Sequence, residues 1–82
     1  VYFTKHAEDK FKILTRHGVR ISKSKVIDTV EYPDIIDYSR LPLLVAQGNL
    51  DRSHVLRIVY KKEKNLITVI TFYPGRKSQY KQ

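Results

Sequence analysis

Residues 55–60 form a short apolar stretch, Val-Leu-Arg-Ile-Val-Tyr, that a single charged residue interrupts. Because successive side chains of a strand point to opposite faces, Leu56 and the even-numbered residues after it share one face, whereas Arg57 lies between two valines on the other. The first face is predicted to be core. An unpaired buried charge is costly, so Arg57 is expected at a carboxylate, at carbonyl groups or in a cleft that receives an anion. The formal net charge of +8 favours the cleft.

The length of the chain limits it to one domain, predicted over residues 1–82. A chain of this size is expected to bury about 60–65% of the surface that it exposes when unfolded. The hydrophobic content of 41%, with six tyrosines and three phenylalanines, indicates a packed domain rather than a disordered tail.

The chain contains no cysteine, which excludes a disulfide framework and a thiolate zinc site and fits a reducing cytoplasm. No apolar run approaches the roughly 20 residues that span a bilayer, so we expect no membrane partner. The chain begins at Val1 rather than methionine, so its start carries no argument about targeting. A cytoplasmic location is therefore the expectation.

Basic residues outnumber acidic ones by 16 to 8. An excess of this size makes a phosphate polyanion the first partner to consider and an acidic protein the second. Charge by itself does not choose between them, and the oligomeric state stays open.

Two helices are predicted in the first part of the chain. Thr4 is a good N-cap for a helix over residues 5–17, in which apolar residues recur at spacings of three and four, and Gly18 supplies a left-handed stop. A second helix is predicted over residues 24–31 and ends before Pro33.

The pattern after residue 33 is that of strands with short connections, which favours antiparallel hairpins. The predicted fold is α+β, with the two N-terminal helices packed on one face of a twisted antiparallel sheet of about four strands. The polar and basic tail, residues 74–82, is expected to be partly mobile. The predicted strands are 34–39, 43–48, 55–62 and 66–73, and residues 2–3 are a candidate edge strand.

The last hairpin has two alternative registers. A turn over residues 62–65 places Arg57 opposite Ile70 and leaves Tyr73 on the core side. A one-residue slip or bulge instead places Arg57 on one face with Thr71 and Tyr73, which is the arrangement that a site needs.

Known site motifs are absent from the sequence. The three histidines are scattered and lack the spacing of metal ligands, so no metal or other cofactor is expected. There is no Gly-x-Ser-x-Gly elbow and no Gly-rich phosphate loop.

What remains is a set of basic and aromatic residues that suits RNA cleavage. Attack of a ribose 2′-hydroxyl on the neighbouring phosphate needs a base, cations for the developing charge and an acid for the leaving oxygen, but no metal. Each residue also has a structural interpretation, in which Arg57 pairs with a buried acid, Tyr73 is core and Lys10 lies on a solvated helix face. The candidate catalytic residues are Arg57, Lys10, His17 and Tyr80, and the candidate RNA-binding residues are Arg16, Arg76, Tyr73 and Lys77.

Five segments occur in an order that resembles small BrnT-like proteins and their uncharacterised relatives. The segment 56–60, followed by a hairpin strand and a terminal tyrosine, is also similar to the C-terminal half of RelE-type toxins. The five segments are Phe3-Thr4-Lys5-His6-Ala7, Arg16-His17-Gly18-Val19, Tyr32-Pro33-Asp34, Leu56-Arg57-Ile58-Val59-Tyr60 and Val69-Ile70-Thr71-Phe72-Tyr73.

This resemblance implies a RelE-like fold and a metal-independent endoribonuclease of the type II toxin class, neutralised by an antitoxin protein that covers the basic site. Arg57 corresponds to the strand arginine of RelE-type toxins, and Tyr80 to their terminal tyrosine. Arg16-His17-Gly18 is similar to the basic-His-Gly element of the BrnT group, while Lys10 and Arg76 match by region only.

The chain departs from the BrnT pattern at residues 71–75, Thr-Phe-Tyr-Pro-Gly, where that pattern carries a run of serine, alanine and arginine. Three hypotheses follow. The first is an endoribonuclease in which Arg57 and Arg76 bind the scissile phosphate, Lys10 or His17 is the base, and Tyr80 stacks or donates a proton. The second is a non-catalytic basic module that binds nucleic acid or an acidic protein. The third is a structural subunit in which Arg57 forms only a core ion pair.

Overall fold

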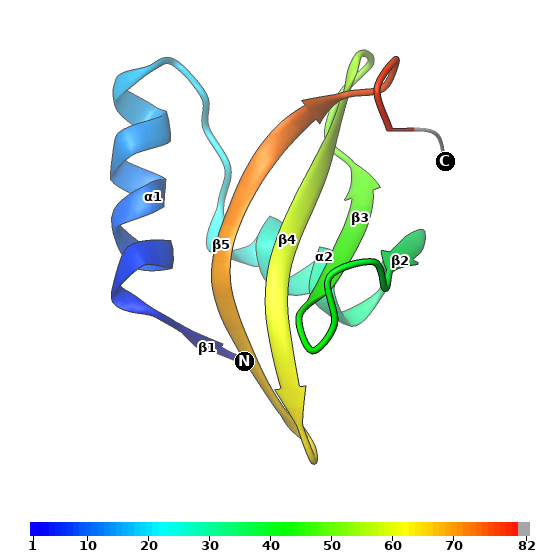
Figure 1. Ribbon diagram of the computed structural model, residues 1–82. Helices are drawn as coiled ribbons and strands as arrows, with labels where there is room; N and C mark the ends of the chain where they lie inside the picture. The colour runs from blue at the N-terminus through cyan, green and yellow to red at the C-terminus, as the bar shows by residue number, and fades with distance from the viewer. Residues whose placement is uncertain (81–82) are drawn as a thin grey trace.

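Two helices and a five-stranded mixed sheet make up the computed structural model, which describes residues 1–80 (Figure 1). The strand order is β1-β5-β4-β3-β2; β1 is parallel to β5 and the other neighbours are antiparallel. The predicted α+β class is confirmed, but the sheet is mixed because the candidate edge strand at residues 2–3 joins it in parallel. The elements are β1 (Tyr2–Phe3), α1 (Lys5–Arg16), α2 (Lys23–Glu31), β2 (Ile35–Asp37), β3 (Leu44–Asn49), β4 (His54–Glu63) and β5 (Leu66–Arg76).

The helix ends follow the caps that the sequence predicts. The Thr4 hydroxyl accepts a hydrogen bond from the Ala7 N–H (3.1 Å) and donates one to the Ile70 carbonyl (3.0 Å), so the start of α1 is tied to β5. After α1 the chain turns through Gly18, whose φ of +79° favours glycine. α2 begins at Lys23, one residue before its predicted start, and the Ser22 hydroxyl caps it by accepting a hydrogen bond from the Lys25 N–H (3.1 Å).

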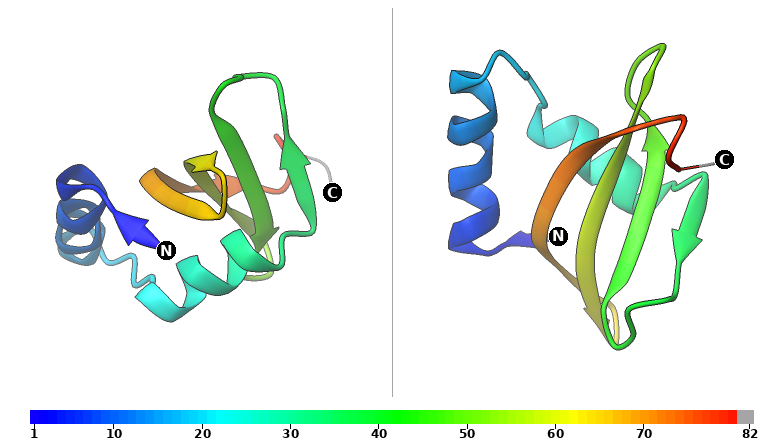
Figure 2. Two further views of the ribbon diagram at one scale, coloured as in Figure 1. Left: turned by 90° about the horizontal axis from the view of Figure 1, so that it is seen from below. Right: turned by 45° about the horizontal axis from the view of Figure 1, so that its top comes forward.

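Both helices cover the same face of the sheet, with α1 against β5 and α2 against β3 and β4 (Figure 2). The face of β4 that begins with Leu56 is core, as the alternation predicts. Within residues 1–80, no helix has the length and apolar character needed to cross a membrane. The buried core residues are Ala7, Ile21, Val26, Val30, Ala46, Leu56, Ile58, Tyr60, Val69 and Phe72.

A β-bulge sets the register of the hairpin formed by β4 and β5. Val59 pairs with Thr71 while the next residue of β4 pairs with Val69, so Ile70 is the extra residue on β5. Arg57 consequently lies opposite Tyr73. The register that opposes Arg57 to Ile70 is therefore wrong, and the bulged alternative describes this hairpin.

The C-terminal segment is held against the sheet rather than free. β5 continues to Arg76, three residues beyond its predicted end, because Pro74 and Gly75 still pair with β4. The Lys77 N–H then bonds to the Ser53 carbonyl (2.9 Å), and the Tyr80 N–H bonds to the Arg76 carbonyl (3.2 Å). Residues 74–80 are therefore in contact with the rest of the domain, and residues 81–82 of the predicted tail lie outside the described residues.

Candidate functional site

Arg57 lies on the sheet face that the helices leave uncovered, and only 5% of it is exposed. Its Nη2 lies 2.9 Å from Asp37 Oδ2, and its Nε donates to the Tyr73 hydroxyl at 3.1 Å. Its Nη1 donates to Gln47 Oε1, and the Tyr80 ring stacks on the guanidinium with 4.1 Å between Cζ and the ring centroid. All three guanidinium nitrogens are therefore engaged by the protein itself.

Arg57 and Asp37 form an ion pair in which each group favours the charged form of the other. Burial disfavours the charged form of Arg57, but its bonds to Tyr73 and Asp37 raise the pKa of Arg57 above its usual value. Hydrogen bonds from Ser39 first, and from Arg57 next, lower the pKa of Asp37 to about 2. Of the three environments expected for Arg57, the structure shows the carboxylate, that of Asp37. The expectation of an anion-binding cleft at Arg57 is wrong.

Gly75 allows Tyr80 to approach the sheet closely. A Cβ at Gly75 would lie 2.6 Å from Tyr80 Cε2 and 2.7 Å from Cδ2, well inside van der Waals contact. The aromatic ring therefore sits directly on the backbone of β5 while it covers Arg57. This packing explains why a glycine suits a strand position where other residues have higher β propensity.

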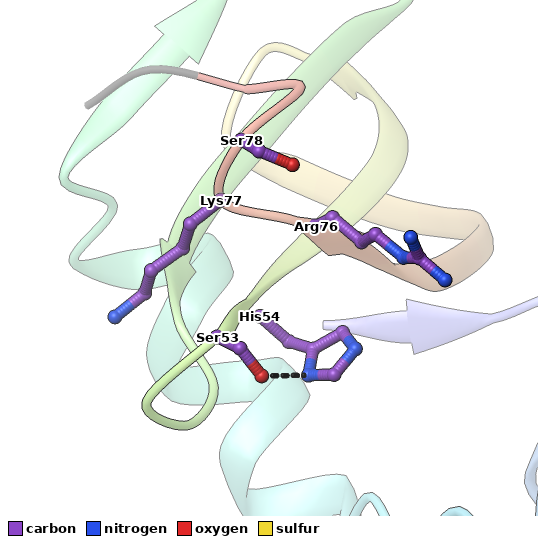
Figure 3. Close-up of a pocket in the computed structure, with 5 residues that line it drawn as sticks. All are labelled: Ser53, His54, Arg76, Lys77 and Ser78. Atoms are coloured by element: carbon purple, nitrogen blue, oxygen red, sulfur yellow. Dashed lines mark hydrogen bonds between the residues drawn. The ribbon is translucent and has the colours of Figure 1, made fainter.

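A second group of polar residues gathers at the end of β5, on the rim of the sheet. A hollow of about 480 Å³ lies there, between the turn that joins β3 to β4 and the residues after β5 (Figure 3). His54 and Arg76 are cross-strand partners, and their side chains extend to the same side, while Lys77 points to the other. We call this hollow the His54 pocket; it is lined by Ser53, His54, Arg76, Lys77 and Ser78.

The imidazole of His54 is oriented by Asp51. Asp51 Oδ1 lies 2.9 Å from His54 Nδ1 and accepts the backbone N–H groups of Ser53 (2.9 Å) and His54 (2.8 Å). Bonds from Ser53 first and from His54 next lower the pKa of Asp51 below its usual value, so this carboxylate is ionised near neutral pH. An ionised carboxylate only accepts hydrogen bonds, so in the neutral imidazole it favours the tautomer with the proton on Nδ1, in which Nε2 is the acceptor; the Ser53 hydroxyl also lies 3.1 Å from Nδ1.

A second hollow of about 360 Å³ shares His54 with the first. Its remaining lining comes from the connection between α1 and α2, from the turn between β3 and β4 and from β5. In Figure 1 these segments lie in the upper part of the molecule, and the turn between β4 and β5 lies at the bottom. We call it the Pro74 pocket; it is lined by Gly18, Val19, Arg20, Leu50, Asp51, His54 and Pro74.

The predicted site residues divide into separate groups. Arg76 and Lys77 both line the His54 pocket, but their side chains point to opposite sides of it (Figure 3). Arg16 ends α1, and His17 immediately precedes Gly18 of the Pro74 pocket. Lys10 lies in the middle of α1 and lines neither pocket. The other three residues, Arg57, Tyr73 and Tyr80, form the neutralised cluster on the opposite face of the sheet.

Asp51 and His54 are a pair that was not predicted from the sequence. Their spacing, an acid three residues before a histidine at a predicted turn, is the signal that indicates such a bond. Over residues 1–80, no group of three or more histidine and acidic side chains could hold a metal ion.

Comparison with known proteins adds no relative. A scan against protein-family models, a search of curated proteins and a search of solved structures each found no match to this chain.

Proposed function

We propose that this chain is a metal-independent endoribonuclease with a RelE-like or BrnT-like fold, and that its reaction takes place in the His54 pocket. The observation that carries the proposal is the 2.9 Å contact between Asp51 Oδ1 and His54 Nδ1, in a pocket that also holds Arg76 and Lys77. An oriented imidazole beside a guanidinium that can bind phosphate is an arrangement suited to RNA cleavage through the 2′-hydroxyl.

The reaction uses these side chains in distinct roles. Nε2 of His54 takes the proton of the ribose 2′-hydroxyl, and the resulting oxygen attacks the adjacent phosphorus. The Arg76 guanidinium binds the phosphate oxygens and stabilises the charge that develops on them. The bond from phosphorus to the 5′-oxygen breaks, and that oxygen takes a proton from solvent water. The products carry a 2′,3′-cyclic phosphate and a 5′-hydroxyl.

This assignment moves the reaction away from Arg57. Because Asp37 already neutralises the Arg57 guanidinium, Arg57 has a structural role and Arg76 binds the phosphate. Arg16 and His17, at the end of α1, directly precede Gly18 of the Pro74 pocket, and they bind the RNA at this basic end of the molecule. The proposed protein partner is an acidic antitoxin that covers this end, as the net charge of +8 favours.

The experiment is cleavage of a long RNA by purified protein in EDTA, with His54→Gln as the critical variant. General base catalysis contributes about 10²- to 10⁴-fold, so His54→Gln is expected to lose at least about 100-fold of the rate. His6→Gln is the matched control, because His6 is exposed on α1 and lines neither pocket. No cleavage by the wild type, or equal cleavage by His54→Gln, would contradict the proposal.

A second candidate function is a non-catalytic module that binds RNA at the same basic end. It is favoured by the bonds of Asp51 to the N–H groups of Ser53 and His54, which brace the turn and give the Asp51 carboxylate a structural role. This candidate predicts RNA binding that weakens with salt and no product with a cyclic phosphate. Product analysis by mass spectrometry separates the two functions.

A further inference from the structure

We infer that the Pro74 pocket is a nucleobase subsite that selects guanine, next to the phosphate site in the His54 pocket. The inference rests on the proposed function and names its substrate class: RNA in which guanosine supplies the attacking 2′-hydroxyl. Cleavage is then expected on the 3′ side of guanosines.

The lining of the Pro74 pocket suits the flat face of a base. Val19, Leu50 and Pro74 supply apolar side chains, and Arg20 supplies a planar guanidinium. Unstacked RNA bases are held in proteins by packing against such planar groups and by hydrogen bonds to their edges. The volume of about 360 Å³ lies in the range of small-ligand pockets.

The two pockets are joined by His54, which lines both. In RNA the base, the 2′-hydroxyl and the 3′-phosphate belong to the same nucleotide. A nucleotide whose 2′-hydroxyl meets His54 Nε2, and whose 3′-phosphate meets Arg76, therefore has its own base free to enter the neighbouring Pro74 pocket. The shared histidine thus predicts which base is read, namely the one before the cleaved bond.

The carboxylate of Asp51 gives the pocket its selectivity. Its bonds to Ser53 and His54 all use Oδ1, so they do not engage Oδ2. An ionised carboxylate is an acceptor only, and guanine is the base whose Watson–Crick edge presents two adjacent donors, N1–H and N2–H. Adenine and cytosine each place an acceptor beside their amino donor, and uracil has one N–H between two carbonyls. Because Oδ1 is already used within the turn, Oδ2 is the oxygen that accepts the two adjacent donors of guanine, whereas each of the other bases would place an acceptor next to its donor at the same oxygen. Asp51 therefore favours guanine over the other three bases.

Binding of the four nucleoside 3′-monophosphates, followed by NMR of the ¹⁵N-labelled protein, tests the inference without any need for catalysis. Guanosine 3′-monophosphate is expected to bind roughly tenfold tighter than the others, with shifts at Val19, Leu50 and Asp51. Equal affinities for the four nucleotides, or shifts confined to residues 76–78, would overturn it.

Asp51→Asn is the decisive variant, since an amide keeps an acceptor for the turn but adds a donor that clashes with the donors of guanine. It is expected to lose the guanine preference while Arg76 still responds to the 3′-phosphate. Asp28→Asn, at an exposed position of α2 outside both pockets, is the control. An unchanged preference in Asp51→Asn would count against the assignment.

The inference and the proposed function fail in different ways. Selective binding of guanosine 3′-monophosphate with no cleavage of RNA would support the subsite and contradict the nuclease. Cleavage of RNA without preference for the base before the cut would support the nuclease and contradict the subsite.

Discussion

The ring of Tyr80 lies on the guanidinium of Arg57, with 4.1 Å between Arg57 Cζ and the ring centroid. Asp37 and Gln47 bind the same guanidinium from β2 and β3, and Tyr73 binds it from β5. One residue of β4 therefore connects three other strands and the C-terminal segment. The charge that looks like a ligand site in the sequence instead organises the open face of the sheet.

Replacement of Arg57 by leucine is expected to destabilise the protein. The change removes the hydrogen bonds to Tyr73 and Gln47, and one bond of a charged group contributes about 1.5–3 kcal/mol to the free energy of unfolding. Urea denaturation measures the loss. Arg52→Leu, in the exposed turn before β4, is the control. Unchanged or increased stability of Arg57→Leu would instead match a simple ion pair that apolar packing can replace.

Gly75→Ala is expected to displace the Tyr80 ring, because the added Cβ would lie 2.6 Å from Tyr80 Cε2. The lost contact between Tyr80 and Arg57 is of the cation–π type, which contributes about 0.5–2 kcal/mol. A double-mutant cycle with Tyr80→Ala measures the coupling. Gly75→Ala should cost much less stability in the Tyr80→Ala background, and equal costs in both backgrounds would show that the ring does not constrain residue 75.

The pH dependence of stability should include a contribution from Asp37. Its pKa falls from an ordinary value of 3.8 to about 2 in the folded protein, so the folded state favours the ionised form. The stabilisation is complete above the ordinary value and is lost as the pH falls through about 2. Urea unfolding of wild type and Asp37→Asn between pH 2 and 6 measures it; the two midpoints should converge at the acidic end. A constant difference across this range would contradict the assignment.

Much of the fold follows from local signals in the sequence. Thr4 and Gly18 mark the ends of α1 because capping depends on a few neighbouring residues. The core face of β4 follows from alternation with period two. The bulge at Ile70 does not follow from local signals, because an apolar side chain next to the core fits either register. The register is decided only by the sum of contacts along both strands.

The site was harder to predict because its contacts depend on register and on turns. Asp37 pairs with Arg57 across an intervening strand, and 20 positions separate them in the chain. Nothing local identifies that carboxylate, so the paired and the ligand-binding interpretations of Arg57 looked alike in the sequence. The bond from His54 to Asp51 depends on a turn of only a few residues, and it is the contact that local reasoning could have found.

The salt dependence of RNA binding should identify the phosphate contacts. Each phosphate contact to single-stranded nucleic acid contributes about 0.7 to the slope of log affinity against log salt, through counterion release. Arg76→Gln and Lys77→Gln are each expected to lower that slope by about 0.7, and the double variant by about twice as much.

Lys62→Gln is the matched control, because Lys62 is an exposed residue at the end of β4. The turn that follows it lies at the opposite end of the strand from His54 (Figure 1). Fluorescence anisotropy of a labelled single-stranded RNA between low and moderate salt provides the slopes. If Lys62→Gln lowered the slope as much as Arg76→Gln does, the RNA would be bound by the charge of the whole surface. That result would contradict the assignment of the phosphate-binding site to the His54 pocket.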